Sequence, residues 1–314
     1  MSEVEKTSRE ISNSLHVLPF YRHPEQMSLM KKIKIFVGSV GLLPVRLMLC
    51  PIGIIPPYLM SFLPMSYNSM THTVFAKSCK WSARFLLFIC GFYKLNVVDK
   101  RVQKESSRLI VSNHTSLFDF LIMVAVNDEL PTFICRSTIS KIPFLSRIAK
   151  TLNCLYISRE SNGVSKLIQT RLKLPGPPLA FFPEATTTNG LYIISFKTGV
   201  FVPGIAVLPI TFEYSYKYFS PAFESIDWKL WLFRSLTEFY HSCTVTIYPI
   251  YYPSDLEKRD AVVYAENMQC FIADQLMLPM YATSRSNQLI YFDYLQDRIT
   301  FNEAYEKIYN KEIN

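Results

Sequence analysis

The sequence is poor in cysteine, and the few cysteines that it has are scattered. Seven cysteines are spread over 314 residues, and no two of them have C-x-x-C spacing. They are too few for a disulfide scaffold, and their spacing argues against a cysteine-based zinc site. We therefore expect reduced, mostly buried thiols in a protein that faces the cytosol or a membrane, and we predict no metal site.

Charged residues are also scarce. Asp, Glu, Lys and Arg make up 18% of the chain, below the ~25% that is usual for soluble domains. Because 49% of the residues are hydrophobic and 14% are aromatic, the composition excludes a disordered chain. The length is sufficient for one large domain or two ordinary ones, with a buried core.

The charges that are present are distributed unevenly. Residues 1–250 contain 27 basic and 15 acidic residues, whereas residues 251–314 contain 6 and 10, and the whole chain carries a net charge of +8. A basic balance of this kind favours an anionic partner, which would be nucleic acid, a membrane surface or a phosphorylated substrate. We expect this partner to bind within the first 250 residues.

A cleavable signal peptide is not indicated. Residues 1–30 mix acidic and basic residues and lack an apolar core. Lys31, Lys32 and Lys34 then precede an apolar region. They are typical of the cytosolic flank of a membrane segment and of contact with anionic headgroups, and a solvated helix face would explain them equally well. We assign residues 1–34 to an N-terminal cytosolic segment.

The next segment lacks charge but also lacks an unbroken apolar run. No Asp, Glu, Lys or Arg occurs from Leu47 to Ala76. Prolines interrupt this stretch at Pro51, Pro56, Pro57 and Pro64. Since proline kinks or breaks a helix, a single straight transmembrane helix is not expected. We predict that residues 35–95 form a membrane-embedded anchor, a broken or re-entrant helical pair inserted in one leaflet. A true span and a buried hairpin of a soluble protein are the alternatives.

Beyond residue 95, short runs of β-forming residues alternate with helix-like segments. Strands are expected at 108–112, 132–136, 154–158, 179–182, 205–210 and 243–250. Helices are expected at 119–126, 163–173 and 259–278. This alternation is typical of an α/β domain with a mainly parallel sheet flanked by helices. We assign residues 96–285 to this domain and residues 286–314 to a polar tail, either a terminal helix or a loosely held extension.

A histidine and an aspartate follow the first of these strands. In the segment N-H-T-S-L-F-D, His114 and Asp119 are five positions apart. In one regular helix their side chains would lie about 140° apart, so they can meet only if His114 is on the turn before the helix and Asp119 is in its first turns. A carboxylate on one ring nitrogen raises the basicity of the other and so produces a general base. The alternative is a loop histidine beside an aspartate at a helix start.

A protein nucleophile for this pair is not evident. The chain has no G-x-S-x-G motif, and no cysteine lies close to His114 in the sequence. A base without a nucleophile suggests direct attack by a substrate hydroxyl. This suits a transfer reaction in which the base deprotonates an acceptor alcohol and a donor supplies an activated acyl group.

Two further loops that follow strands are rich in polar groups. The segment 182–190, F-P-E-A-T-T-T-N-G, places a glutamate beside three threonines and an Asn-Gly turn, which would suit a polar headgroup or an ordinary capped turn. Arg159 follows the strand at 154–158, where its forked donors would bind phosphate. A surface ion pair with Glu160 is the alternative for Arg159.

The order of these segments resembles the four motif blocks of the glycerophospholipid acyltransferase family. Asn113 and His114 with Asp119 resemble the N-H-x4-D block, 154–159 the second block, 182–190 the F-P-E-G-T block and 207–210 the V-P block. The resemblance implies that His114 and Asp119 are catalytic. It implies substrate binding by the other motif residues, which are Asn113, Arg159, Glu184, Thr186, Asn189, Gly190 and Pro209. Because Glu184 would repel a phosphate, it is expected to bond a hydroxyl or to orient Arg159.

A closer similarity, over 195–210 and 252–269, is to the lysophosphatidylcholine acyltransferase branch. It implies transfer of a fatty acyl chain from acyl-CoA, a co-substrate, to a lysophospholipid, with no cofactor. It also implies a location at the endoplasmic reticulum membrane, with lipid droplets as a second site and the active site at the cytosolic leaflet. The chain has no EF-hand loop, so no calcium regulation is expected. Nucleic acid is not expected as a partner, because the basic residues match no reader motif.

The chain departs from the family pattern at two places. Ala185 replaces the glycine that follows the glutamate, which adds a methyl group where the backbone would approach the substrate. Asn153 and Cys154 stand where the second block usually begins with glycine. Two other functions stay open, the first because headgroup choice depends on pocket shape and the second because of Ala185. One is a 1-acylglycerol-3-phosphate acyltransferase, and the other is a non-catalytic membrane or lipid-droplet adaptor.

Overall fold

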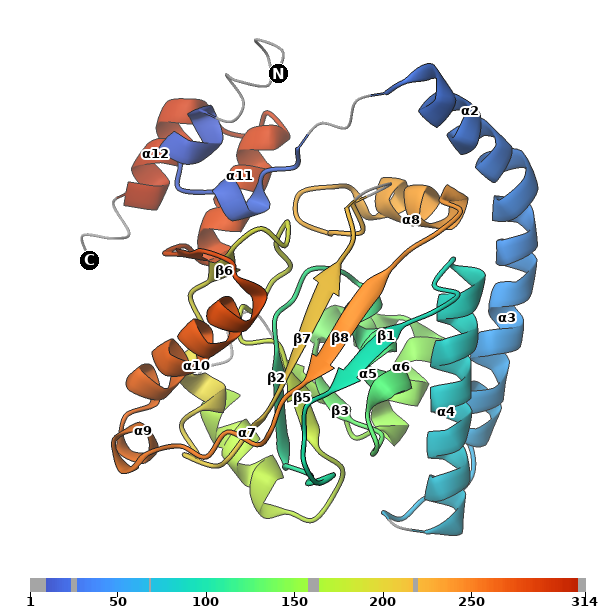
Figure 1. The fold of residues 1–314 in the computed structure, drawn as a ribbon, viewed down its shortest axis with the longest axis vertical. Helices are drawn as coiled ribbons and strands as arrows, with labels where there is room; N and C mark the ends of the chain where they lie inside the picture. Colours follow the sequence, from blue (N-terminus) through green and yellow to red (C-terminus); the bar gives the residue numbers. More distant parts are fainter. Residues whose placement is uncertain (1–9, 24–26, 68, 158–163, 217–219, 310–314) are drawn as a thin grey trace.

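The computed structural model describes residues 10–23, 27–67, 69–157, 164–216 and 220–309. Its centre is a seven-stranded sheet in the order β1-β8-β7-β2-β5-β3-β4 (Figure 1). The strands are β1 Asn96–Asp99, β2 Leu109–Ser112, β3 Thr132–Arg136, β4 Leu155–Ile157, β5 Leu179–Phe181, β7 Leu208–Tyr214 and β8 Cys243–Ile247. All neighbours are parallel except β7 and β8. The predicted class, an α/β fold with a mainly parallel sheet, is confirmed.

One expected strand was placed too early in the chain. The run 205–210 predicts a strand there, but β7 extends from Leu208 to Tyr214. The strand continues past the apolar run because β8 pairs with it antiparallel over residues 210–214, while only Glu213 among these side chains is exposed. The two shortest strands, β6 Ile193–Ile194 and β9 Met280–Tyr281, form a separate parallel pair. Neither they nor β1 was expected.

Helices cover both faces of the sheet. On one side lie α4 Met70–Ile89, α5 Phe118–Val126, α6 Pro143–Thr151 and α8 Trp228–Thr237; on the other lie α7 Val164–Lys173, α9 Asp255–Arg259 and α10 Ala261–Leu276 (Figure 1). Alternate residues of β2 point to opposite faces of the sheet. Ile110 packs in one apolar core with α4 and α5, and Val111 packs in a second core with α7 and α10. The expected helix 259–278 is α10, which begins at Ala261 because Asp260 ends α9 and caps α10 through the amides of Val262 and Val263.

The predicted anchor region is a pair of long helices. A continuous helical segment runs through α2 Leu29–Val37, a π-helical turn Gly38–Leu42 and α3 Leu43–Met60, and α4 packs against α3. The expected break at the prolines is wrong for Pro51, Pro56 and Pro57, which lie inside α3. The break expected at Pro64 is confirmed, because the chain turns there, between α3 and α4. Tertiary packing explains the difference, because α3 approaches α4 so closely at Gly53 that a Cβ there would lie 2.8 Å from the Leu86 side chain.

Among the described residues, Leu29–Met60 is the one helix that is long and apolar enough to cross a membrane. Its 32 residues correspond to about 48 Å at 1.5 Å per residue, more than the ~30 Å of a bilayer core. Only 11% of its most apolar window is buried inside the protein. The helix therefore presents most of its apolar surface outward.

Described segments near the two ends of the chain pack against each other. Helices α11 Arg285–Leu295 and α12 Phe301–Tyr309 enclose an apolar cluster together with residues near the N-terminus (Figure 1). The buried members of the cluster are Leu15, Val17, Phe20, Ile194, Ile290, Tyr291, Ala304 and Ile308. We call residues 10–22 and 285–309 the terminal cap. Over the part of the tail that the structure describes, the expectation of one helix or a loose extension is wrong, because it forms two packed helices.

Candidate functional site

The predicted histidine and aspartate meet at the carboxyl end of β2. His114 lies on the turn after β2, and Asp119 is the second residue of α5. The Nδ1 atom of His114 is 2.8 Å from Oδ2 of Asp119. Asp119 is fully buried, whereas 11% of the His114 side chain is exposed. The geometry expected from their spacing is confirmed.

The Asp119 carboxylate is held by hydrogen bonds on both oxygens. The backbone amides of Thr115 and Ser116 donate to Oδ2 at 2.8 and 3.0 Å, and the Tyr214 hydroxyl donates to Oδ1. Charge-assisted bonds of this kind fix the carboxylate and keep it available to His114. Sequence analysis missed Tyr214, because the strand was expected to end at Ile210, four residues before it.

The imidazole of His114 is clamped by aromatic rings. It stacks on Phe182 with ring centroids 4.2 Å apart, and Phe120 approaches its edge at 5.4 Å. Within the described residues, its Nε2 atom makes no hydrogen bond. With Nδ1 engaged by Asp119, Nε2 is the nitrogen that is free to accept a proton from another molecule.

Glu184 supports the backbone of the histidine. It follows β5, is 1% exposed, and its Oε1 atom accepts a hydrogen bond from the His114 amide at 2.7 Å. Burial raises the pKa of Glu184 to about 8, the bond from the His114 amide lowers it, and the nearby charge of Asp119 raises it. Burial thus favours the protonated form of the acid that lies behind the histidine.

The loop 184–190 is tied to distant parts of the chain. The hydroxyl of Thr186 donates to Gln288 of α11, and the side-chain amide of Asn189 donates to the carbonyls of Leu18 and Tyr21 at 2.9 and 3.0 Å. The amide of Thr188 donates to the His114 carbonyl at 3.0 Å. The loop that was predicted to suit a polar headgroup is thus buried, and it joins the histidine turn to the terminal cap through hydrogen bonds. Substrate binding by Thr186 and Asn189 stays a prediction.

The remaining predicted site residues are placed as follows. Both ends of the Asn113 side-chain amide bond the backbone of Phe212 in β7, at 2.9 Å each. Pro209 is buried in the middle of the sheet opposite Val111 rather than at its carboxyl edge. Gly190 has a φ of +72°, and a Cβ there would lie 1.9 Å from the Tyr216 hydroxyl. Arg159 lies outside the described residues, so its role also stays a prediction.

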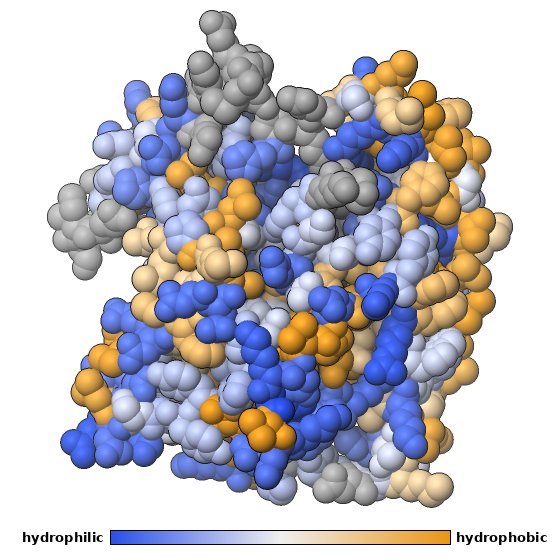
Figure 2. All heavy atoms as spheres, viewed as in Figure 1, coloured by the Kyte–Doolittle hydropathy of each residue, from blue (hydrophilic) through white to orange (hydrophobic). Residues whose placement is uncertain are grey.

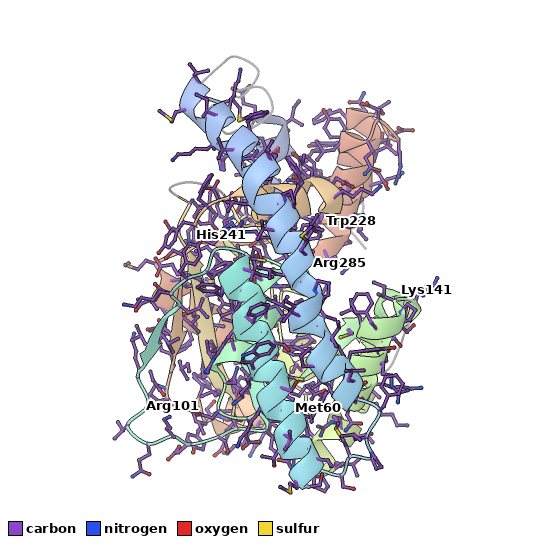
Figure 3. The ribbon with its side chains drawn as sticks, turned by 90° about the vertical axis from the view of Figure 1, so that its right-hand side faces the viewer. Met60, Arg101, Lys141, Trp228, His241 and Arg285 are labelled. Carbon is purple, nitrogen blue, oxygen red and sulfur yellow. The ribbon has the colours of Figure 1, made fainter. Side chains whose placement is uncertain are left out.

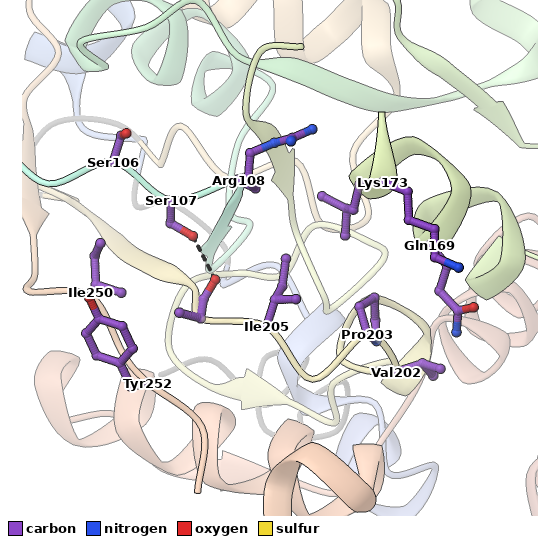
Figure 4. Close-up of a pocket in the computed structure, with 12 residues that line it drawn as sticks. Ser106, Ser107, Arg108, Gln169, Lys173, Val202, Pro203, Ile205, Ile250 and Tyr252 are labelled. Carbon is purple, nitrogen blue, oxygen red and sulfur yellow. Dashed lines mark hydrogen bonds between the residues drawn. The ribbon is translucent and has the colours of Figure 1, made fainter. Parts of the chain in front are cut away.

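A cavity of about 620 Å³ lies at the opposite edge of the sheet (Figure 4). Its walls include Arg108 just before β2, Ile205 before β7 and Lys173 at the end of α7. Ligands of open α/β sheets bind beyond the carboxyl ends of the strands, where His114 and Glu184 lie. We therefore place the functional site at His114 and not in this cavity. No group of three or more His, Cys, Asp or Glu side chains in the described part of the chain is arranged to hold a metal ion.

Comparison with known proteins finds similarity to acyltransferases. The family model named Acyltransferase matches residues 94–213. A lysophospholipid acyltransferase of Arabidopsis thaliana is 31% identical over 253 residues, which cover 70% of this chain and 63% of the relative. The lysophosphatidylcholine acyltransferase of Drosophila melanogaster is 27% identical over 84% of this chain and 53% of its own length. The chain thus spans between about half and two thirds of these curated relatives.

A solved structure has the same fold. The crystal structure of the 1-acyl-sn-glycerophosphate (LPA) acyltransferase PlsC from Thermotoga maritima superposes with a TM-score of 0.55 at 18% sequence identity. The match covers 79% of this chain and 98% of that one. It therefore includes most of the sheet and helices described above.

Proposed function

Because residues 94–213 form an acyltransferase domain and the curated relatives are lysophospholipid acyltransferases, we propose that this protein acylates the free hydroxyl of a lysophospholipid, with acyl-CoA as donor. The acceptor that we propose is of the lysophosphatidylcholine type. The observation that carries the proposal is the buried His114–Asp119 pair, whose Nε2 is free to act as a base. No cofactor is needed for this reaction.

In the proposed reaction, Nε2 of His114 removes the hydroxyl proton as the oxygen attacks the thioester carbonyl. A C–O ester bond forms, the C–S bond breaks, and the proton passes from His114 to the departing CoA thiolate. Asp119 stabilises the imidazolium that exists between these two proton transfers. The reaction is direct transfer without an acyl-enzyme, because a nucleophilic side chain is not needed when the acceptor is itself activated.

The acceptor phosphate is assigned to Arg159, whose fork of donors suits a phosphate. The raised pKa of Glu184 favours the neutral acid, which opposes a nearby anion less than a carboxylate would. Its bond to the His114 amide supports a positioning role for Glu184. This differs from the expectation that Glu184 contacts the substrate.

We assign the protein to the endoplasmic reticulum membrane, with the active site at the cytosolic leaflet. The outward apolar surface of Leu29–Met60 supports membrane insertion of the α3–α4 pair. No Asp or Glu occurs from residue 26 to residue 98, whereas several lysines do, and this favours contact with anionic headgroups.

An acyl transfer assay on microsomes tests this function. We expect wild-type protein to acylate at least one member of a panel of lysophospholipids from labelled acyl-CoA. His114→Ala should lower the rate by on the order of 10²–10⁴-fold, because the general base is lost. His72→Ala is the matched control, since His72 lies at the start of α4 outside the site, and it should keep the wild-type rate.

The panel also separates the other functions. A preference for lysophosphatidic acid would identify a 1-acylglycerol-3-phosphate acyltransferase. If well-expressed, membrane-bound protein acylates no lysophospholipid of the panel, the adaptor function would be favoured. A wild-type rate in His114→Ala would refute the mechanism.

A further inference from the structure

Helix α8 exposes large apolar side chains although it carries a well-packed inner face. Trp228 is 56% exposed, Leu230 51% and Phe233 36%, while Trp231 and Leu236 on the same helix are buried in the main core. Side chains of this size rarely gather on a surface that faces only water. Around the helix, Phe233 lies about 60° from Leu230, and Trp228 lies about 160° from Leu230 in the first turn. The exposed surface of α8 between Trp228 and Leu230 is therefore suited to a partner.

This face is continuous with the exposed surface of α2 (Figure 2, upper right). The carbonyl of Thr237 at the end of α8 touches Gly38 so closely that a Cβ there would lie 2.1 Å from it. From α3, the buried Arg46 donates to the carbonyls of Leu236 and Glu238 at 2.8 and 2.6 Å. Because α8 is fixed to the long helix, whatever contacts Leu29 to Phe36 also lies next to α8.

The charges within helices α2 and α8 are all positive, although Asp227 and Glu238 cap the two ends of α8. Lys229 lies beside the Trp228 ring, 5.9 Å from its centroid, and Lys32 and Lys34 are exposed on α2. Neither α2 nor α8 contains an acidic residue. Tryptophan and lysine among aliphatic residues are typical of helices that lie at the headgroup level of an anionic bilayer. In Figure 3 the long helix lies in front, and Trp228, at the start of α8, lies behind it.

The segment before α8 contacts the histidine turn. The Phe223 amide donates to the Thr115 carbonyl at 2.9 Å, and the Ser116 hydroxyl donates to the Pro221 carbonyl at 2.7 Å. The Trp231 indole donates to that same Pro221 carbonyl at 3.0 Å. The position of α8 therefore determines the position of the residues beside His114.

We propose that α8 is a second membrane contact, which lies flat on the surface of an anionic bilayer beside the α3–α4 pair. It sets the His114 turn at the depth of the headgroups, where a lysophospholipid in the leaflet presents its hydroxyl. The placement of the His114 turn rests on the proposed function, whereas the membrane contact of α8 does not.

Quenching by brominated lipids tests the contact directly. The full chain carrying Trp81→Phe is reconstituted in vesicles of brominated phosphatidylcholine and phosphatidylserine, and compared with the same protein carrying Trp228→Phe as well. The difference isolates the emission of Trp228, which we expect to be strongly quenched and blue-shifted. Leu256→Trp in the double variant is the matched control, since Leu256 on α9 is 61% exposed but distant from α8 (Figure 1), and its emission should not be quenched.

An activity measurement tests the consequence for the site. Leu230→Ser with Phe233→Ser should raise the KM for a lysophospholipid presented in anionic vesicles on the order of tenfold. The KM for a short-chain acceptor dissolved as monomers should not change. Equal changes for both acceptors would refute the positioning role of α8.

The quenching and activity measurements distinguish failure of the membrane contact from failure of the proposed function. Unquenched Trp228 in protein that is incorporated into the vesicles would overturn the membrane contact, whatever the activity, and would leave the face to a protein partner or a second copy. Strong quenching without acyl transfer by the wild type would instead overturn the proposed function.

Discussion

Two residues that depart from the family pattern share a backbone conformation. Ala185 has a φ of +57° and Asn153 a φ of +55°, both in the left-handed region that favours glycine. A family glycine at each position is therefore explained by the backbone rather than by a close approach to substrate. Asparagine tolerates this region well, whereas alanine is strained by about 1–2 kcal/mol.

Replacing Ala185 with glycine should stabilise the protein. We expect Ala185→Gly to raise the free energy of unfolding by about 1 kcal/mol and to leave the transfer rate at least as high as in the wild type. Thermal unfolding in detergent micelles measures the first effect. Ala180→Gly, at a buried strand position in β5, is the control and should be destabilising. A loss of stability in Ala185→Gly would mean that the methyl group packs favourably enough to offset the strain.

Local sequence was sufficient to identify the His114–Asp119 pair, because their meeting depends on one strand, one turn and one helix start. It was not sufficient for their supports. Tyr214 is 95 residues from Asp119 and Glu184 is 70 residues from His114, and these contacts follow from the strand order alone. No spacing rule within a single sequence predicts such contacts.

At the scale of the elements, one arginine joins the long helix to α8. The last carbonyls of a helix have no partner inside the helix, and Arg46 supplies donors to two carbonyls at the end of α8. The guanidinium is buried, with 4% of the residue exposed. In the sequence, Arg46 only interrupts an apolar region, and nothing there indicates that it reaches α8.

Removing this link should loosen α8. Arg46→Met keeps a long side chain but leaves two buried carbonyls without their donor, so we expect a loss of about 2–3 kcal/mol of unfolding free energy. Hydrogen exchange at the α8 amides should also accelerate. Arg298→Met is the control, because Arg298 is 66% exposed and its ion pair with Asp293 contributes less than about 1 kcal/mol. Equal effects of the two variants would contradict the role of Arg46.

The prolines and β7 show why element boundaries were harder to predict than element types. Pro51, Pro56 and Pro57 would end an isolated helix, but contact with α4 holds α3 together around them. The apolar run before Ile210 marks only part of β7, because pairing with β8 extends the strand through polar residues. In both cases a neighbour that is distant in sequence outweighs the local preference.

For the whole molecule, the terminal cap closes a chain of contacts that ends at the histidine. Residues near Leu18 and Gln288 hold the loop 184–190, and that loop holds the His114 backbone through Glu184 and Thr188. The polar composition of residues 286–314 does not indicate this packing, since its few apolar side chains form a core together with residues 15–20 and Ile194. At the centre of these contacts lies Glu184, a buried acid whose pKa is raised to about 8.

Stability should therefore depend on pH through Glu184. Between the ordinary pKa of a glutamate, about 4.5, and the folded value of about 8, the unfolded chain has released this proton while the folded protein retains it. The unfolded state binds fewer protons, so stability falls as pH rises across this window, by at most about 1.4 kcal/mol per pH unit. Below pH 4.5 the stabilisation is fully present, and above pH 8 it is lost.

The comparison with Glu184→Gln isolates this effect, because glutamine does not titrate and its carbonyl can still accept from the His114 amide. We expect the unfolding free energy of the wild type, relative to Glu184→Gln, to decrease steadily from pH 5 to pH 8 in micelle-based unfolding curves. His241, whose pKa burial lowers to about 4, acts with the opposite sign, since its protonation in the unfolded chain makes stability rise with pH up to about 6.5. It is present in both proteins and cancels in the difference. Parallel curves for the two proteins would show that Glu184 is ionised in the fold, and that the His114 turn rests on a buried carboxylate rather than on a neutral acid.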